Sequence, residues 1–336
     1  MEKKKLRAAL LGFGSMGHFH ASCYPEQKDV ELVAVCDIDP AKFDNKSADI
    51  NIGNSGKTDL TDVRRYLSYE EMVKDGGFDF IDICLPGYLH AEYAIRAMNE
   101  GFDVLCEKPM ARYSKQAEEM IKCAESTGRR LMIAQCLRFD PSYEKFRELL
   151  LSNEFGELLR LDMRRNSGMP ESEWYHDPAK SGGALLDLHL HDTDFINWIF
   201  GMPEAVRTCG ICRDNDGIDE LITTYIYSDG PVINAESSWC RSSWYCCANA
   251  VFRHATVTLE NHIVRVIRFY PESRTEEYDF TREHDAYFNE IAAFAAGNTE
   301  KCSMYSTRDS IVIAEAEERS ARNKGAEIKL KQGMDI

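Results

Sequence analysis

The sequence predicts an α/β protein of two domains, in which a mostly parallel sheet precedes an α+β domain with a large, mostly antiparallel open sheet. Three observations indicate this. The 336 residues are enough for two domains of roughly 150 residues each. Up to residue 140, short apolar runs alternate with helical patterns, as in the βαβ crossovers of a parallel sheet. In residues 141–336, strand-like stretches follow one another, so we expect a second domain there.

The strands predicted for the first domain are short apolar runs bounded by Gly, Pro, Asp or charged residues. Between them, two segments carry apolar residues at helical spacing and end near the helix-stopping residues Gly101 and Gly128. The expected strands are Leu6–Leu11, Val30–Cys36, Phe78–Leu85, Asp103–Cys106 and Arg130–Cys136, and the expected helices are Tyr88–Glu100 and Ser114–Thr127.

The second domain is predicted to begin with a connecting helix and to carry one long helix before a succession of strands rich in Thr, Tyr, Ile and Val. Two helices and a short strand are expected to close it. The expected elements are the helix Ser142–Leu151, the strand Leu158–Arg165, the helix Gly183–Phe200, strands within Val206–Ile267, the helices Asp285–Ala296 and Thr307–Asn323, and a strand near Lys324–Leu330.

The chain is acidic, with 40 Lys and Arg against 56 Asp and Glu and a net charge of −16. This balance argues against nucleic acid and anionic membranes as partners, because both need a basic surface. No apolar run approaches the roughly 20 residues of a membrane helix. Arg7 interrupts the apolar stretch that follows the basic start Met1–Lys5, so we expect no signal peptide and a cytoplasmic protein.

The cysteines fit a reducing compartment. Of the 12 in the chain, Cys36 and Cys84 are examples that stand inside apolar runs, where buried thiols are the simpler interpretation. Cys209 and Cys212 form a single Cys-x-x-Cys, but no second pair of ligands lies at zinc-finger spacing. We therefore predict no structural metal, and the role of this pair stays open.

A Gly-x-Gly-x-x-Gly motif directly follows the first predicted strand and opens a segment that can be helical. In such a loop the first glycine makes a tight turn, the second lets the backbone approach a pyrophosphate, and the third allows close helix packing. A glycine turn without a ligand and an FAD site are the alternatives. The expected dinucleotide contacts come from Gly12, Phe13, Gly14, Ser15, Met16 and Gly17.

The second predicted strand ends at an acidic residue that favours NAD over NADP. Asp37 stands 20 residues after Gly17, where its carboxylate would accept hydrogen bonds from the adenosine ribose and repel a 2′-phosphate. Ile38 follows it, and no Arg or Lys comes immediately after. We expect both residues to contact the cofactor.

Two further segments carry reactive side chains. Glu107–Pro109 follow a predicted strand at the carboxyl edge of the sheet, where ligands bind in open α/β folds. In the long predicted helix, Asp187, His191 and Asp194 stand at i, i+4 and i+7, which is one helix face.

Together with the glycine loop, these segments resemble the Gfo/Idh/MocA oxidoreductase family, and the resemblance covers essentially the whole chain. It implies that Lys108 is a catalytic lysine that also contacts nicotinamide and substrate. It implies that His191 accepts the proton and that Asp187 binds and orients the substrate. Glu107 belongs to the same motif as Lys108 and is expected to contact the cofactor.

The resemblance also implies contacts from loops. Leu85, Pro86 and His90 match a family motif that flanks the cofactor, with Leu85 in place of Thr. Gln135 and Arg138 stand where the family links its domains and are expected to face nicotinamide or substrate.

An aromatic loop and a strand supply further candidates. Trp174 and Tyr175 resemble the family's aromatic loop over the substrate, with a packed surface turn as the alternative. Arg164 and Arg165 alternate along a strand, so at most one faces the substrate, and Arg164 there would suit an acidic sugar. His189 points about 200° away from His191 on a helix and is left unassigned.

The chemistry agrees with these roles. Oxidising a secondary alcohol to a ketone removes a hydride from carbon and a proton from oxygen. An imidazole suits His191 to act as base near neutral pH, and the ammonium group of Lys108 would stabilise a developing alkoxide. No metal is then required, and we expect Lys108 and His191 to share the proton transfer.

The leading hypothesis is an NAD-dependent dehydrogenase that acts on a secondary hydroxyl of a sugar, sugar derivative or inositol. One alternative is an NAD-dependent glycoside hydrolase that works through transient oxidation and elimination. Another is a non-enzymatic NAD-dependent regulator on the same scaffold. By analogy with the family, the exposed face of the second sheet is expected to support a homodimer or homotetramer.

Overall fold

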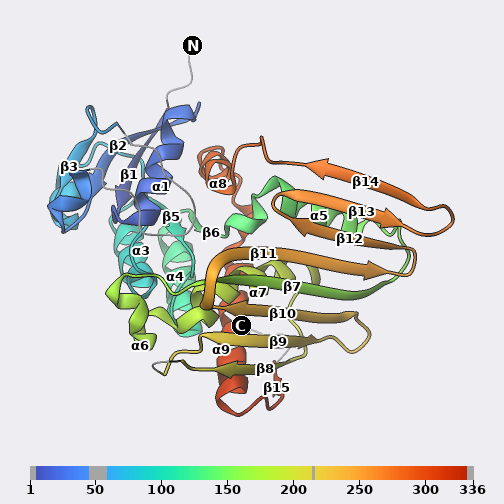
Figure 1. Cartoon of the computed structure of the whole chain (residues 1–336). Coiled ribbons are helices and arrows are strands. Elements are labelled where there is room, and N and C mark those ends of the chain that lie inside the picture. Colours follow the sequence, from blue (N-terminus) through green and yellow to red (C-terminus); the bar gives the residue numbers. More distant parts are fainter. Residues whose placement is uncertain (1–4, 45–58, 214–215, 331–336) are drawn as a thin grey trace. The chain divides into compact units, whose positions relative to one another are not determined.

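The computed structural model describes residues 5–44, 59–213 and 216–330, and it divides into two compact units (Figure 1). Unit 1 comprises residues 1–136, 170–172 and 286–308, and unit 2 comprises residues 137–169, 173–285 and 309–336. Residues 1–4, which begin the basic start of the chain, lie outside the described residues. Among the described residues, no helix combines the length and apolar character needed to cross a membrane.

Unit 1 is built on a six-stranded sheet in the order β3-β2-β1-β4-β5-β6, and every paired strand runs parallel to its neighbour. The order reverses between β1 and β4, and ligands of such sheets bind beyond the carboxyl ends of the strands at this reversal. The predicted parallel sheet is confirmed. The strands are β1 (Leu6–Leu11), β2 (Val30–Cys36), β3 (Arg64–Tyr66), β4 (Phe80–Ile83), β5 (Asp103–Glu107) and β6 (Leu131–Ala134).

Helices connect these strands, and the central strands are almost wholly buried. Every residue of β4 and β6 is buried, which explains their continuous apolar character, because helices cover both faces of a parallel sheet. Asp82 of β4 is the one charged residue in these two strands, and it is buried as well. The connecting helices are α1 (Ser15–Cys23), α2 (Tyr69–Asp75), α3 (His90–Asn99) and α4 (Ser114–Thr127). Helix α8 (Ala286–Ala295) comes after β14 in the chain and packs on α1 and β6.

Unit 2 is built on a nine-stranded sheet in the order β14-β13-β12-β11-β7-β10-β9-β8-β15. Only β7 and β10 pair in parallel; the other paired strands are antiparallel, as predicted. The strands are β7 (Leu158–Gly168), β8 (Ala205–Ile211), β9 (Glu220–Ile226), β10 (Val232–Ser238), β11 (Cys240–Phe252), β12 (Ala255–Glu260), β13 (Ile263–Arg268), β14 (Arg274–Asp279) and β15 (Ile328–Lys329).

Helices cover one face of this second sheet. Helix α5 (Pro141–Leu151) packs on β12 and β13, and a π-helical turn at Leu185–His189 packs on β7 and β10. Three further α-helices follow α5 in the described part of the chain besides α8: α6 (Pro178–Ser181), α7 (Leu190–Phe200) and α9 (Met304–Arg322).

The long helix predicted over Gly183–Phe200 is confirmed, and a π-helical turn at Leu185–His189 interrupts it. Gly182 ends α6 in the left-handed conformation, and Gly183 also has a positive φ of 70°. The two left-handed glycines separate α6 from the long helix. Gly183 and Ala184 are the first residues of that helix, the π-helical turn follows them, and α7 continues from Leu190.

The predicted single boundary at Pro141 differs from the division in the structure. The chain first passes from unit 1 to unit 2 between Cys136 and Leu137, and residues 286–308 belong to unit 1 again. Helix α8 supplies part of that core: the Phe294 ring lies 4.8 Å from the ring of Phe80. The late segment belongs to unit 1 because its apolar face is buried there.

Candidate active site

The loop between β1 and α1 uses its three glycines differently. A Cβ at Gly12, whose φ is +93°, would lie 2.8 Å from the carbonyl group of Cys84, and a Cβ at Gly17 would lie 2.1 Å from the Gly12 oxygen. A Cβ at Gly14 would meet no atom within 4 Å. The fold itself therefore requires the outer glycines, whereas Gly14 keeps a space open at the loop.

The start of α1 is suited to an anion. Its N-cap residue is Gly14, so no capping side chain occupies the first backbone N–H groups, and the first turn carries no acidic residue. Gly14, Ser15 and Met16 are partly exposed, while Phe13 is buried. Backbone amides at a helix N-terminus carry partial positive charge and bind phosphate groups. These residues can hold a pyrophosphate although the chain as a whole is acidic.

Asp37 is fixed at the end of β2 as a hydrogen-bond acceptor. The backbone N–H of Phe13 donates to its Oδ2 at 2.7 Å, and that of Asp39 donates to its Oδ1 at 2.9 Å. Each carboxylate oxygen retains a lone pair for a further donor. Ile38 beside it is 88% exposed. The carboxylate is thus held as an acceptor after β2, and its contact with the ribose stays a prediction.

Lys108 is the single side chain that a ligand can reach in its segment. Every other residue from Val104 to Arg112 is buried, whereas Lys108 is partly exposed. It directly follows β5, at the carboxyl edge of the sheet, and its peptide bond to Pro109 is cis. This segment therefore presents one ammonium group among buried neighbours.

Gln135 supplies an observation that favours a cofactor. It follows β6, is 1% exposed, and its Nε2 has no hydrogen-bond partner among the described residues. A buried donor without an acceptor costs about 1–3 kcal/mol. A nicotinamide carboxamide oxygen is an acceptor of the required kind. Gly14, Asp37 and Gln135 together fit a nicotinamide dinucleotide.

His90 has a different role from the one expected. Its Nδ1 and Nε2 both lie 2.7 Å from carbonyl oxygens, those of Pro109 and Leu85. Burial lowers the pKa of the His90 imidazole. The ring connects the loop to the segment after β5 and offers no nitrogen to a ligand, which corrects the expected cofactor contact. Leu85 and Pro86 are partly exposed, and their contacts stay predictions.

Glu107 is also turned inward, which corrects the contact expected of it. Its Oε2 accepts the backbone N–H of Lys108 at 2.9 Å, and its Oε1 lies 3.0 Å from Nε2 of His20. Sequence reasoning missed His20 and its second partner, Asp82. The available signal was an aspartate inside the apolar strand β4.

In unit 2, Asp187 and His191 are the exposed pair of a buried helical segment. All other residues from Ser181 to Asn197 are buried. Asp187 lies in the π-helical turn, and His191 is the second residue of α7, which follows it. Such turns occur frequently at functional sites. The segment therefore leaves one carboxylate and one imidazole partly exposed.

Arg138 and Asp194 do not belong to that exposed face. They form a two-pronged ion pair at 2.8 and 2.7 Å, and each is 1% exposed. Ser310 also donates to Asp194 at 2.7 Å. Asp194 is therefore buried in unit 2, although it stands only three residues after His191 on α7. The expected substrate contact of Arg138 is corrected, because its guanidinium group is used inside unit 2.

Arg164 and Arg165 lie on opposite faces of β7, as predicted, but each pairs with a carboxylate of unit 2. Arg165 is buried on the helix-covered face, 2.8 Å from Asp192 of α7. Arg164 lies on the open face, 2.9 Å from Glu236. His191 is carried by α7, which covers the opposite face, so the expected substrate contact of Arg164 is corrected.

The aromatic loop is formed as a 3₁₀ turn. Trp174 and Tyr175 are partly exposed and stacked at 3.8 Å, and Tyr175 meets the buried Trp239 edge-on at 5.8 Å. Their contact with substrate stays a prediction.

His189, previously unassigned, lies in the core, with Nδ1 2.8 Å from the Ser237 hydroxyl, so its role is structural.

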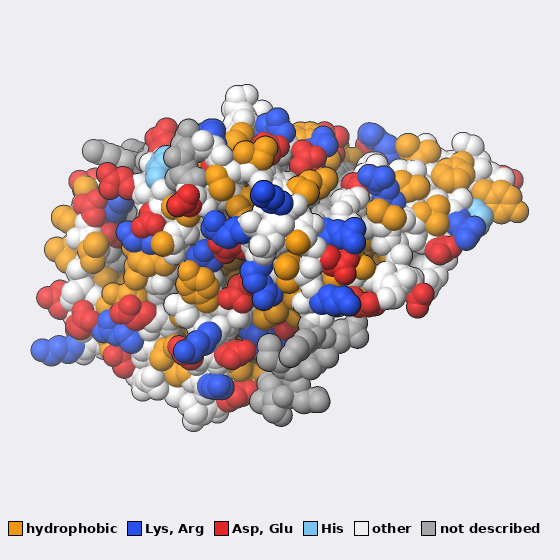
Figure 2. Space-filling view, turned by 90° about the horizontal axis from the view of Figure 1, so that it is seen from below, with side chains coloured by type: hydrophobic (Ala, Val, Ile, Leu, Met, Phe, Trp, Pro, Cys, Tyr) orange, Lys and Arg blue, Asp and Glu red, His pale blue; other side chains and the backbone are white. Residues whose placement is uncertain are grey.

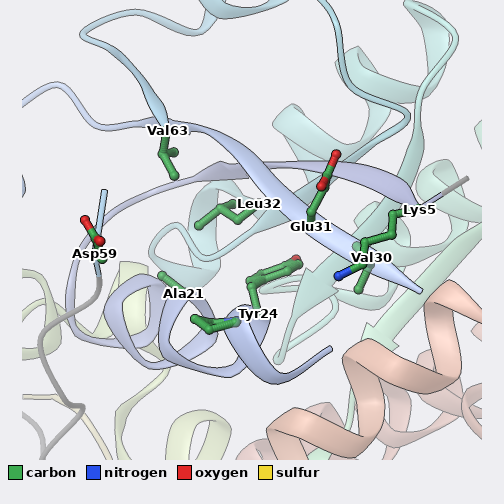
Figure 3. Close-up of a pocket in the computed structure, with 9 residues that line it drawn as sticks. Lys5, Ala21, Tyr24, Val30, Glu31, Leu32, Asp59 and Val63 are labelled. Atoms are coloured by element: carbon green, nitrogen blue, oxygen red, sulfur yellow. The ribbon is translucent and has the colours of Figure 1, made fainter. Parts of the chain in front are cut away.

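One cavity of about 190 Å³ lies elsewhere in unit 1 (Figure 3). Ala21 and Tyr24 line it from the helical side, and Val30, Glu31 and Leu32 line it from the start of β2. It therefore sits at the amino end of that strand, away from the carboxyl edge where Asp37 lies. We do not assign it to the cofactor.

Charged side chains of both signs and free thiols occur on the described surface. Figure 2 shows acidic and basic side chains interspersed over the face it presents. All 12 cysteines are free thiols, and Cys209 and Cys212 are exposed. Within the described ranges, the groups of side chains close enough to hold a metal both contain the buried His20.

Two family models match the chain. Residues 6–135 match one described as "Oxidoreductase family, NAD-binding Rossmann fold", and residues 143–260 match the GFO/IDH/MocA C-terminal domain.

Similar proteins include dehydrogenases. A trans-1,2-dihydrobenzene-1,2-diol dehydrogenase of Macaca fuscata fuscata is 33% identical over 50% of this chain and 51% of its own length. A D-glucoside 3-dehydrogenase of Escherichia coli is 29% identical over 62% of this chain and 57% of its own length. The chain therefore spans about half the length of the curated relatives it matches.

Solved structures share the fold. A levoglucosan dehydrogenase in complex with NADH and levoglucosan has a TM-score of 0.83 at 17% identity, over 98% of this chain and all of that one. The WlbA dehydrogenase of Bordetella pertussis, in complex with NADH and UDP-GlcNAcA, has a TM-score of 0.78 at 20% identity, over 98% of this chain and 100% of that one.

Proposed function

The chain belongs to the GFO/IDH/MocA family of oxidoreductases, and from this premise we propose that it is an NAD-dependent dehydrogenase acting on a secondary hydroxyl of a sugar, sugar derivative or inositol. One observation carries the proposal. Two otherwise buried described segments expose only Lys108 in one case, and Asp187 with His191 in the other. An ammonium, a carboxylate and an imidazole are the groups that alcohol oxidation needs.

The residues of unit 1 would hold NAD through backbone and side-chain contacts. The amides of Gly14–Met16 would bind the pyrophosphate, Asp37 the adenosine ribose, and Nε2 of Gln135 the nicotinamide carboxamide. NAD supplies the hydride acceptor when bound. The fixed carboxylate of Asp37 disfavours a 2′-phosphate, which supports NAD over NADP.

The reaction leaves a proton for the protein to manage. We assign the substrate hydroxyl proton to Nε2 or Nδ1 of His191, because a neutral imidazole has a lone pair for it. Lys108 donates a hydrogen bond to the same oxygen and stabilises the charge that develops there. Asp187 accepts a hydrogen bond from a neighbouring hydroxyl or from the imidazole, which fixes the orientation of both.

The substrate class rests on the protein's own side chains and on the names of similar proteins. The stacked rings of Trp174 and Tyr175 offer an aromatic face to the C–H surface of a sugar ring. A D-glucoside 3-dehydrogenase and a levoglucosan dehydrogenase are among the similar proteins, which supports a carbohydrate hydroxyl. The corresponding ketone with NADH would be the substrate in the reverse direction.

The test is a screen of NAD reduction with the whole chain over free sugars, inositols, sugar acids and aryl glycosides. We expect NADH to accumulate with at least one free polyol or sugar. Release of aglycone without net NADH would instead identify an NAD-dependent hydrolase. Binding of NAD with no reaction on any compound in either direction would contradict the proposed activity.

Variants assign the residues. Lys108→Ala and His191→Ala are each expected to abolish turnover while NADH still binds, measured by NADH fluorescence. A turnover rate near that of the wild type in either variant would remove that residue from the mechanism.

Two accompanying proposals concern assembly and compartment. We propose a homodimer or homotetramer through the open face of the nine-stranded sheet, where Ile222, Val232 and Ile267 are exposed. Light scattering at micromolar concentration tests this, and a monomer would contradict it.

The free cysteines support a reducing, cytoplasmic setting.

A further inference from the structure

A fully buried histidine in unit 1 connects the cofactor-binding helix to the segment that carries Lys108. His20 lies on α1, and its Nδ1 is 3.0 and 3.1 Å from the two oxygens of Asp82 in β4. On the other side, its Nε2 is 3.0 Å from Oε1 of Glu107, the last residue of β5. His20 and Asp82 have no exposed surface.

The network has two outer members. Tyr24 donates its hydroxyl proton to Asp82 at 2.8 Å, on the side away from Glu107. Glu290 of α8 lies 3.7 Å from Nε2 of His20. The ring is thus enclosed by acidic oxygens from two strands and one helix.

Both ring nitrogens of His20 lie within hydrogen-bond distance of carboxylate oxygens. Ionised carboxylates only accept hydrogen bonds, and an imidazole donates from both nitrogens only when it is protonated. Burial alone would lower the pKa of His20, but the carboxylate of Asp82 opposes it and the pKa is raised well above its usual value. A cation here also offsets the buried negative charge.

Glu107 contacts both His20 and the backbone of Lys108, so it links the two residues. One of its oxygens is held by His20, and the other accepts the backbone N–H of Lys108 at 2.9 Å. The direction in which Lys108 leaves the strand end is therefore set by a carboxylate whose own orientation depends on His20.

We propose that His20 is a positioning residue for Lys108, acting through Glu107 without touching substrate or cofactor. This inference rests on the proposed function, in which Lys108 acts on the substrate hydroxyl. A displacement of about 1 Å at a reacting group can cost about a hundredfold in rate. Loss of the bond between His20 and Glu107 should therefore lower kcat while NADH affinity stays unchanged.

Two isosteric substitutions separate the two sides of the ring. The amide nitrogen of Asn matches the position of Nδ1, so His20→Asn keeps the bond to Asp82 and loses the one to Glu107. The amide nitrogen of Gln matches Nε2, so His20→Gln keeps the bond to Glu107. Tyr24→Phe is the matched control, because it removes one buried hydrogen bond to Asp82 on the side away from Glu107.

Three readouts are taken from the whole chain: kcat and KM, NADH affinity by fluorescence, and the nuclear magnetic resonance signal of ¹³C-methylated Lys108, assigned with Lys108→Arg. We expect His20→Asn to lose about tenfold or more in kcat and to displace the Lys108 signal. His20→Gln and Tyr24→Phe should keep the signal and stay within about threefold in kcat, a difference of less than 1 kcal/mol.

The outcome decides the proposal in every case. A kcat that follows thermal stability across the three variants, with an unmoved Lys108 signal, overturns it. If His20→Asn does not fold, Glu107→Gln replaces it: its amide has one acceptor for two donors, so one bond must be lost and the signal must shift. If the wild type turns over no substrate, the proposed function fails, but the Lys108 signal still decides the role of His20.

Discussion

Replacing Gly14 by alanine separates what the fold needs from what the cofactor needs. The new methyl group would meet no atom within 4 Å, and the residue has φ −76° and ψ −160°, which alanine adopts readily. Such a Gly→Ala change stabilises by about 0.4–1 kcal/mol through the unfolded chain. Losing glycine at an N-cap costs about as much. The free energy of unfolding should therefore change by less than about 1 kcal/mol.

The effect on NAD should be large. The methyl group would occupy the space at the start of α1 that a pyrophosphate oxygen needs in order to reach the amides. A hydrogen bond to a charged group contributes about 1.5–3 kcal/mol, which corresponds to about a 10- to 100-fold weaker affinity. Fluorescence titration with NADH measures the affinity, and urea unfolding measures the stability.

Gly17→Ala is the matched control. Its methyl group would lie 2.1 Å from the backbone oxygen of Gly12, so the fold must distort and the unfolding midpoint must fall. Gly14→Ala with unchanged NADH affinity and an unchanged fold would refute the pyrophosphate position. A loss of stability in Gly14→Ala equal to that in Gly17→Ala would refute the division of roles among the glycines.

Three more predictions follow from contacts in the structure. Arg138→Met leaves Asp194 as a buried, uncompensated charge, so the free energy of urea unfolding should fall by about 3–5 kcal/mol. The control Arg164→Met removes an exposed ion pair and should cost at most about 1 kcal/mol. Equal losses in the two variants would contradict a structural role for Arg138 inside unit 2. Gln135→Met removes a donor that no described residue uses, so stability should hold within about 1 kcal/mol while NADH affinity falls severalfold, and unchanged NADH affinity would remove Gln135 from the cofactor site. His262 lies 3.4 Å from Asp140, whose hydrogen bond raises the pKa of the imidazole; the pair therefore stabilises below the ordinary histidine pKa and the effect is lost as pH rises through the raised value. His262→Gln should lower the melting temperature near pH 6 and leave it unchanged near pH 9, and an equal loss at both would exclude the charge as its cause.

Local patterns predicted the fold well, because each one is set by nearby residues. The predicted strands Leu6–Leu11 and Val30–Cys36 and the helix Ser114–Thr127 have the observed bounds. The bounds at 78–85 and 130–136 were too wide, because the flanking residues leave the ladder to form the loops at the sheet edge. Apolar run length does not record where hydrogen bonding between strands stops.

The partners of charged side chains could not be predicted from one sequence. Arg138 and Asp194 are 56 positions apart, and nothing in either segment indicates that they meet. The same holds for His20 and Glu107, 87 positions apart. Motif spacing predicted which residues carry chemistry, whereas folding decides which of these candidates are exposed and which are used internally.

The return of residues 286–308 to unit 1 affects how this chain is made. On a ribosome, all six strands of the parallel sheet emerge long before α8, so the covering helix reaches Phe80 and His20 only after the whole nine-stranded sheet except β15 has been synthesised. A fragment cut at residue 136 would leave these buried groups uncovered. The two units are therefore interdependent in assembly, and the order of synthesis differs from the order in which the core of unit 1 can close.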